Sequence, residues 1–255
     1  MRSETVERLR CPLCHGRFQW SAVERSGTEI RSAQVRCPSC GTRSEVREGI
    51  GYFLPGDAEL ARDSPRGRMG EGRPRPATDP RWARSIHRCA EFARGALGPD
   101  AAPLLALDAQ GILAPFAPGG GYHVVQDPAE LAPRGDPGSD GWDELVVDLH
   151  SLPFVDDAAG AGIAGPSLQA TPGTRVILRE LHRLVRGRLV AIVAVQGGTG
   201  TEGGERSNFT EEGLLEEFRG AHWSPQFVPV DEVELARGVA PDGSVTVRWG
   251  VVLAE

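Results

Sequence analysis

Residues 104–132 read LLALDAQGILAPFAPGGGYHVVQDPAELA and form the most informative segment of the chain. One apolar run ends in an acid, Asp108, and a second apolar run ends in another acid, Asp127. Short apolar runs ending in an acid are typical of the strands of a nucleotide-binding parallel sheet. Between Asp108 and Ile112 the turn has one glycine, Gly111, where such a turn usually has several. The segment therefore predicts a cofactor fold whose first turn is altered.

Helical and strand-like segments alternate from residue 82 to the end of the sequence. Helical spacing predicts helices over 82–97, 175–185 and 209–221, and apolar runs predict strands over 102–108, 122–127, 144–148, 160–165 and 189–195. Two further strands, 225–230 and 244–255, are predicted on either side of a Pro-Asp-Gly turn. This alternation predicts an α/β class domain over residues 81–255, with a doubly wound parallel sheet and an antiparallel C-terminal edge.

Some side chains of these helices are assigned to the core by their spacing. The predicted core faces are Trp82, Ile86, Cys89, Phe92 and Ala93 in the first helix and Val176, Leu178, Leu181, Leu184 and Val185 in the second. Thr210 or Asn208 is expected to cap the third helix.

Four of the five cysteines form two Cys-x2-Cys pairs near the N-terminus. They are Cys11, Cys14, Cys37 and Cys40. Two such pairs supply the four thiolates that tetrahedral zinc prefers, which predicts a structural Zn²⁺ site in a small zinc ribbon over residues 1–56. Short strands are expected around the turn at Ser26–Gly27, and metal binding would supply much of the folding free energy of so small a module.

Charge is unevenly distributed along the 255 residues. All 28 basic residues are arginine; residues 1–56 carry nine Arg against six Glu, whereas residues 89–255 carry eleven Arg against 24 acids. The basic N-terminal region could meet RNA or an unknown protein partner, or it could dock on the acidic body of the same chain. Four thiolates with Zn²⁺ add a charge of about −2, which weakens the case for RNA.

Residues 57–80 are rich in Gly, Pro, Arg and acids and are predicted to form a flexible linker. The N-terminus lacks the apolar core of a signal peptide, and no apolar run is long enough to span a bilayer. A cytoplasmic protein without a membrane partner is therefore expected.

The N-terminal motifs resemble a known zinc ribbon. LRCPLCHGRF, VRCPSCG and the tail REGIGYFLP (47–55) are similar to the ribbon of the small activator subunits that partner RNA and protein methyltransferases. They also resemble the ribbon that opens some ribosomal-RNA guanine methyltransferases.

The C-terminal motifs resemble the class I S-adenosylmethionine-dependent methyltransferases, in particular the group that acts in quinone biosynthesis. VVQDPAELA, VVDLHSLPFVDDA and LRELHRLVRGRLVAIV carry this resemblance. It implies a Rossmann-like fold in which Asp127 holds the ribose of S-adenosylmethionine and Asp148, with the adjacent Leu149, lies at the adenine. By the same resemblance, Asp108 and Gly111 stand where the family's first motif binds the cofactor.

The sequence departs from that family at the first motif. One glycine, Gly111, replaces the glycine-rich turn, and only 19 positions separate Asp108 from Asp127. No general base is evident; His150 and Tyr122 are the nearest candidates for a substrate-facing polar group, and ordinary structural roles are the alternative.

Three functions therefore stay open. The first is methyl transfer to RNA or a small metabolite. The second is a catalytically silent scaffold or partner subunit that docks through its ribbon, and the third is a fold repurposed for another ligand or reaction.

Overall fold

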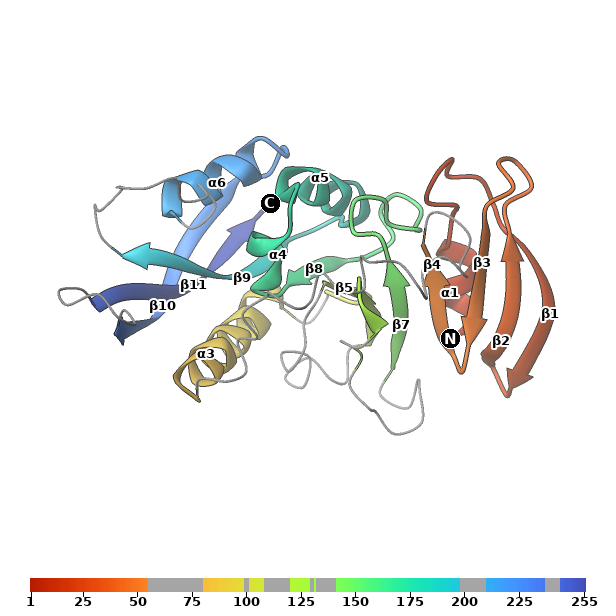
Figure 1. The fold of residues 1–255 in the computed structure, drawn as a ribbon, viewed down its shortest axis with the longest axis horizontal. Coiled ribbons are helices and arrows are strands. Elements are labelled where there is room, and N and C mark those ends of the chain that lie inside the picture. The colour runs from red at the N-terminus through yellow and green to blue at the C-terminus, as the bar shows by residue number, and fades with distance from the viewer. Residues whose placement is uncertain are drawn as a thin grey trace.

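The computed structural model describes residues 1–54, 80–98, 101–107, 120–128, 131, 141–197, 210–236 and 244–255. In chain order the elements are α1 (Ser3–Arg8), β1 (Gln19–Ser26), β2 (Glu29–Arg36), β3 (Arg43–Arg47), β4 (Ile50–Phe53), α3 (Pro80–Leu97), β5 (Leu104–Leu107), β6 (Gly121–Val125), β7 (Trp142–Val147), β8 (Ala161–Ala164), α4 (Ser167–Ala170), α5 (Thr174–Leu184), β9 (Leu189–Gly197), α6 (Glu211–Arg219), β10 (Pro225–Ala236) and β11 (Ser244–Ala254). The strands form one 11-stranded sheet in the order β1-β2-β3-β4-β7-β6-β5-β8-β9-β11-β10 (Figure 1).

The middle of this sheet is parallel and doubly wound. Strands β7, β6, β5, β8 and β9 pair in parallel, and the strand order reverses between β5 and β8. Numbered from β5, this is the 3-2-1-4-5 order of Rossmann-like folds. Strand β11 lies antiparallel between β9 and β10 and completes the C-terminal edge. The predicted fold class is confirmed, and every residue of the parallel strands β5 to β8 is buried.

Helices cover both faces of the sheet. The apolar sides of α4, α5 and α6 belong to one core cluster, and that of α3 belongs to a second cluster on the other face (Figure 1). Thr210 caps α6 as predicted, since its Oγ1 accepts a hydrogen bond from the Gly213 N–H at 3.2 Å. Among the described residues, no helix combines the length and the apolar character needed to cross a bilayer.

Two residues assigned to the core faces of helices are exposed instead. Phe92 of α3 is 41% exposed and Val176 of α5 is 46% exposed. In α3 the buried stripe consists of small side chains, including Cys89 and Ala90, which let the helix lie close to the sheet. In α5 the buried face includes Ile177, one position from Val176 and about 100° around the helix.

The N-terminal strands form an antiparallel meander. β1 and β2 pair on either side of the turn at Gly27 (φ +59°), as the sequence predicted. β3 and β4 form a second hairpin through Glu48 (φ +52°) and Gly49 (φ +86°), where two consecutive positive φ angles match a type I′ turn. These two short strands and α1 were not predicted.

This meander continues into the parallel sheet. β4 pairs in parallel with β7, with Gly51 opposite Leu145 and Phe53 opposite Val147. Side chains of both regions, such as Val46 and Phe53 on one side and Leu145 on the other, share one core cluster. The predicted linker of residues 57–80 lies outside the described residues except for Pro80, the first residue of α3, so the domain boundary at residue 56 stays a prediction.

Candidate functional site

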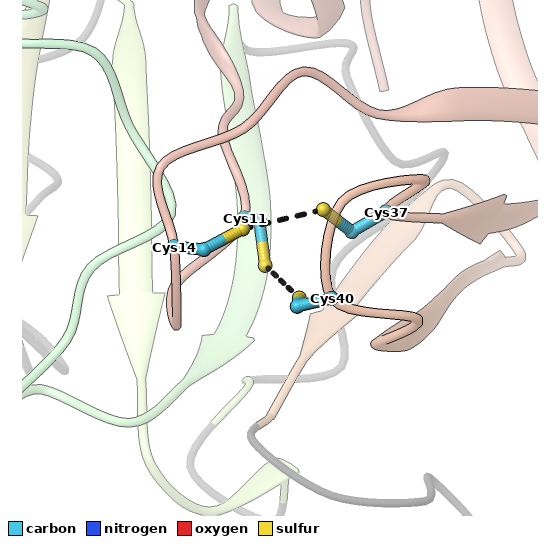
Figure 2. Close-up of side chains that lie close together, drawn as sticks. All are labelled: Cys11, Cys14, Cys37 and Cys40. Atoms are coloured by element: carbon cyan, nitrogen blue, oxygen red, sulfur yellow. Dashed lines mark hydrogen bonds between the residues drawn. The ribbon is translucent and has the colours of Figure 1, made fainter.

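The four predicted metal ligands lie together in two facing turns (Figure 2). Their sulfur atoms all lie within 4.8 Å of one another, and the Sγ–Sγ distances are 3.4 Å for Cys11–Cys40 and for Cys14–Cys37. Four sulfurs about 2.3 Å from a tetrahedral zinc ion would be separated by about 3.8 Å. None of the four forms a disulfide. The cluster therefore has the donor set and nearly the dimensions of a four-thiolate metal site.

The two turns have the same backbone hydrogen-bond pattern. The Cys11 N–H donates to the Gly16 carbonyl at 2.9 Å, and the Cys37 N–H donates to the Thr42 carbonyl at 2.8 Å. Gly41, in the second turn, has a φ of +80°. Its counterpart in the first turn, His15, has a φ of +55°.

Backbone N–H groups also point at the sulfurs. Cys11 Sγ accepts from the N–H groups of Leu13 and Cys14, and Cys40 Sγ accepts from the N–H of Thr42. The Thr42 hydroxyl lies 3.0 Å from Cys40 Sγ. These two bonds from Thr42 lower the pKa of the Cys40 thiol to about 6, because they stabilise the thiolate. The two turns therefore direct backbone N–H groups at the sulfurs of Cys11 and Cys40, an arrangement that stabilises thiolates.

The first cysteine turn is bonded to the loop that follows β7. The Ser151 hydroxyl donates to the Pro12 carbonyl, and the Arg10 N–H donates to the Pro153 carbonyl at 2.9 Å. On its other side the same loop is held by α5, whose Arg183 donates to the Phe154 carbonyl at 2.9 Å. The first cysteine turn and α5 thus both hold this loop.

A partly buried ion pair joins the N-terminal end of α1 to the start of β7. Asp143, whose side chain is 1% exposed, accepts from the Arg2 N–H at 2.8 Å and from Arg2 Nε at 2.9 Å. The buried Thr5 hydroxyl donates to the same carboxylate. This cluster and the β4–β7 pairing show that the basic N-terminal region docks within its own chain, which was one of the two alternatives left open.

The predicted cofactor acids follow neighbouring strands. Asp148 comes directly after β7, and Asp127 comes two residues after the end of β6. Val125, the last residue of β6, pairs with Val146, so both acids lie just beyond the carboxyl ends of adjacent strands. Ligands of this fold bind beyond the carboxyl ends of the strands, next to the reversal of strand order. Both acids are partly exposed at that edge, and Leu149 is buried beside them. Asp108 and Gly111 lie outside the described residues.

The two candidate substrate-facing groups have different surroundings. Tyr122 is 3% exposed, and its ring packs on Phe154 with a centroid distance of 4.9 Å, which is a structural role. His150 is exposed and lies 2.9 Å through Nδ1 from Asp148 Oδ1 and 2.8 Å through Nε2 from the Pro172 carbonyl.

The segment that follows β8 lies at the carboxyl edge of the parallel strands. Gln169 of α4 is 2% exposed, and its side-chain amide both donates to the carbonyl of Ala194 (3.1 Å) and accepts from its N–H (2.8 Å). β8 ends at Ala164, opposite Ala191, so Gln169 pairs with the part of β9 that β8 does not reach. No sequence pattern predicts this contact, because a lone glutamine has no characteristic spacing.

Exposed arginines gather at the edge of the sheet that holds the cysteine turns. Arg36 at the end of β2 lies opposite Arg43 at the start of β3, and Arg17 comes two residues before Gln19, which also pairs with Arg36. None of the three has an ion pair within the part of the chain that the structure describes. Because β4 is parallel to β7, the end of β2 and the start of β3 lie at the carboxyl edge of the parallel strands.

Comparison with known proteins gives structural likenesses only. No family model matches the chain, and no curated protein sequence matches it. An S-adenosylmethionine-dependent methyltransferase from Aquifex aeolicus is 12% identical over 70% of this chain and 99% of its own, with a TM-score of 0.49. A chain of the complex between the Haloferax volcanii Trm112 methyltransferase activator and the putative methyltransferase is 13% identical over 76% of this chain and 95% of its own, with a TM-score of 0.47.

The [4+2]-cyclase SpnF is 22% identical with a TM-score of 0.43, over 56% of this chain and 59% of the cyclase's own length. At these sequence identities and TM-scores the comparisons show only a broadly similar arrangement of the chain. The fold is therefore assigned from the strand order and register.

Proposed function

We propose that this chain binds S-adenosylmethionine and belongs to the class I methyltransferases. The observation that carries the proposal is the pair of acids, Asp127 and Asp148, just beyond the carboxyl ends of the adjacent strands β6 and β7. Both acids stand within the motifs that resemble this family. A carboxylate can accept two ribose hydroxyls, and a second can accept the exocyclic N–H of adenine. When bound, S-adenosylmethionine supplies an activated methyl group.

The chain's own residues would bind the adenosine half of that cofactor. Asp127 would hold the ribose, and Asp148 with Leu149 would hold the adenine. For the methionine half of the cofactor, the candidate binding residues are Asp108 and Gly111, which are proposed from the sequence alone. Methyl transfer depends mainly on placing the acceptor in line with the methyl group, so the lack of an evident general base does not argue against activity.

We further propose that Cys11, Cys14, Cys37 and Cys40 hold one structural zinc ion. All four positions of a tetrahedral shell would be filled by thiolates, which leaves no open position for catalysis. The ion would stabilise the ribbon, and through Ser151 and Pro153 it would stabilise the loop that carries Asp148.

The arginines at the carboxyl edge favour an anionic acceptor. Arg17, Arg36 and Arg43 lie at the same edge of the sheet as Asp127 and Asp148, so an acceptor that reaches the cofactor can extend towards them. The four thiolates of the proposed zinc site would offset about two of these three positive charges, and the remaining positive charge can still bind a phosphate. Among the candidate acceptors we therefore favour RNA over a small neutral metabolite. The proposed location of the protein is the cytoplasm.

The proposal is tested by calorimetric titration of the zinc-loaded chain with S-adenosylhomocysteine. We expect the wild type to bind it and Asp127→Ala to lose detectable binding, because the ribose hydroxyls lose both acceptor oxygens. Asp231→Asn on β10, at the far end of the sheet, is the matched control and should bind as the wild type does. A wild type that fails to bind at about millimolar ligand contradicts the proposal. That result would favour the silent scaffold or the repurposed fold.

A further inference from the structure

The Asp148 carboxylate is held through one of its two oxygens. Asp148 Oδ1 lies 3.0 Å from the His150 backbone N–H and 2.9 Å from His150 Nδ1. Within the described part of the chain, no group hydrogen-bonds Oδ2. The carboxylate is therefore anchored on its protein side and has one oxygen free to accept a hydrogen bond from a ligand.

The His150 ring reaches beyond its own loop to a second element. Its Nε2 lies 2.8 Å from the carbonyl of Pro172, in the segment between α4 and α5. Gly173 follows with a φ of +76°, and a Cβ at that position would lie 2.9 Å from His150 Nε2. The His150 ring can therefore pack against this segment only if residue 173 is glycine.

Both ring nitrogens face acceptors, the Asp148 carboxylate and the Pro172 carbonyl. A neutral imidazole has one N–H, so it can satisfy only one of these acceptors, whereas an imidazolium satisfies both. Partial burial of the ring lowers the pKa of His150, but the bonds to Pro172 and Asp148 outweigh it and raise that pKa above its ordinary value of 6.5. Asp148 is the charged group that faces the ring; Pro172 and Gly173 of the α4–α5 segment bring no charge.

We propose that His150 is a positioning residue of the adenosine site, whose imidazolium links Asp148 to the Pro172 carbonyl and so aims Asp148 Oδ2 at the adenine. The inference rests on the proposed cofactor. When the imidazolium loses a proton, one of its two bonds is lost, so the ring no longer ties Asp148 to the Pro172 carbonyl, and the carboxylate is held less firmly through the His150 backbone N–H and at most one ring N–H. Binding of the adenosine half is then linked to protonation of His150 and weakens as the pH rises through the pKa of this residue.

The test is the affinity for S-adenosylhomocysteine, measured on the zinc-loaded full chain from about pH 5.5 to about pH 8.5. We expect the wild-type dissociation constant to rise about 3- to 10-fold across this range, the value of one hydrogen bond. His150→Gln should remove that dependence, because an amide does not titrate and can still donate to Asp148. His182→Gln is the matched control, since the His182 ring packs on Trp223 at a centroid distance of 5.0 Å, and it should keep the wild-type profile.

The outcomes separate this inference from the proposed function. A wild type that binds with the same affinity at every pH, or a His150→Gln variant that keeps the wild-type pH dependence, overturns the positioning role alone. A wild type without affinity for the ligand overturns the proposed function and the positioning role together. Proton NMR titration of the His150 ring gives a readout that needs no ligand, and a pKa at or below 6.5 also contradicts the linkage.

Discussion

Replacing Asp143 by alanine tests whether the ribbon and the sheet are one folding unit. The change removes an acceptor from Arg2 Nε and N and from the Thr5 hydroxyl, all at the junction of α1 with β7. Breaking a fully buried ion pair costs about 3–5 kcal/mol of unfolding free energy. Because the Arg2 side chain is 32% exposed, water can partly solvate the remaining guanidinium. We therefore expect a loss of about 2–4 kcal/mol.

Urea denaturation followed by tryptophan fluorescence measures this loss directly. For a chain of this size, it corresponds to a fall in melting temperature of roughly 5–15 °C. Glu217→Ala is the matched control, because it breaks a pair with Arg175, whose side chain is 46% exposed, and should cost less than about 1 kcal/mol. Amide exchange should accelerate in both β4 and β7 of Asp143→Ala. A variant as stable as Glu217→Ala, or one in which β4 alone exchanges faster, would refute the view that this cluster joins the two regions.

Two further predictions concern the metal and the sheet. Cys37→Ser should reduce bound zinc, measured by metal analysis, well below the expected one ion per chain, and it should lower the melting temperature. Cys89→Ala, on the buried face of α3, should leave the zinc content unchanged. Equal zinc in both variants would contradict the assignment. Gly121→Ala should prevent stable folding, because a Cβ there would lie 2.1 Å from the Leu104 carbonyl oxygen. Gly95→Ala in α3 has open space around the new Cβ and should stabilise the chain by about 0.5–1 kcal/mol. Thermal denaturation of the two variants side by side checks the sign of each effect.

The parallel sheet was predictable because its strands are buried on both faces and appear as continuous apolar runs. LVAIVAV became β9, and even the weak run GAGIAG became β8. The sequence predicted which segments form helices, but it predicted less well which side chains of each helix are buried. A window that counts apolar residues cannot distinguish Val176 from Ile177, since which of them is buried depends on where the helix meets the sheet.

The pairing of β4 with β7 could not be predicted, because it joins segments about ninety residues apart and depends on which strand of the sheet is left at the edge. β4 has four residues, too few for a periodic signal. The clustering of the four cysteines was predictable for the opposite reason, since two local Cys-x2-Cys turns determine their own geometry, and their role as zinc ligands stays a prediction. Asp127 and Asp148 were predicted by motif, and their cofactor role stays a prediction. The bond between His150 and Pro172 depends on the packing of the α4–α5 segment, which no local pattern indicates.

The position of the ribbon changes what it can do. A parallel sheet that ended at β7 would expose the unpaired backbone groups of an edge strand, and β4 covers them. Because ribbon and sheet belong to one chain, this contact forms at an effective concentration that does not depend on the amount of protein. A protein partner that recognised the ribbon would have to use the outer surface, where β1 is largely exposed and Arg36 and Arg43 lie close together. In the proposed function, zinc held by the cysteine turns would act first on the loop that carries Asp148 in the same chain. We therefore expect removal of zinc to weaken binding of the adenosine half before any partner is involved.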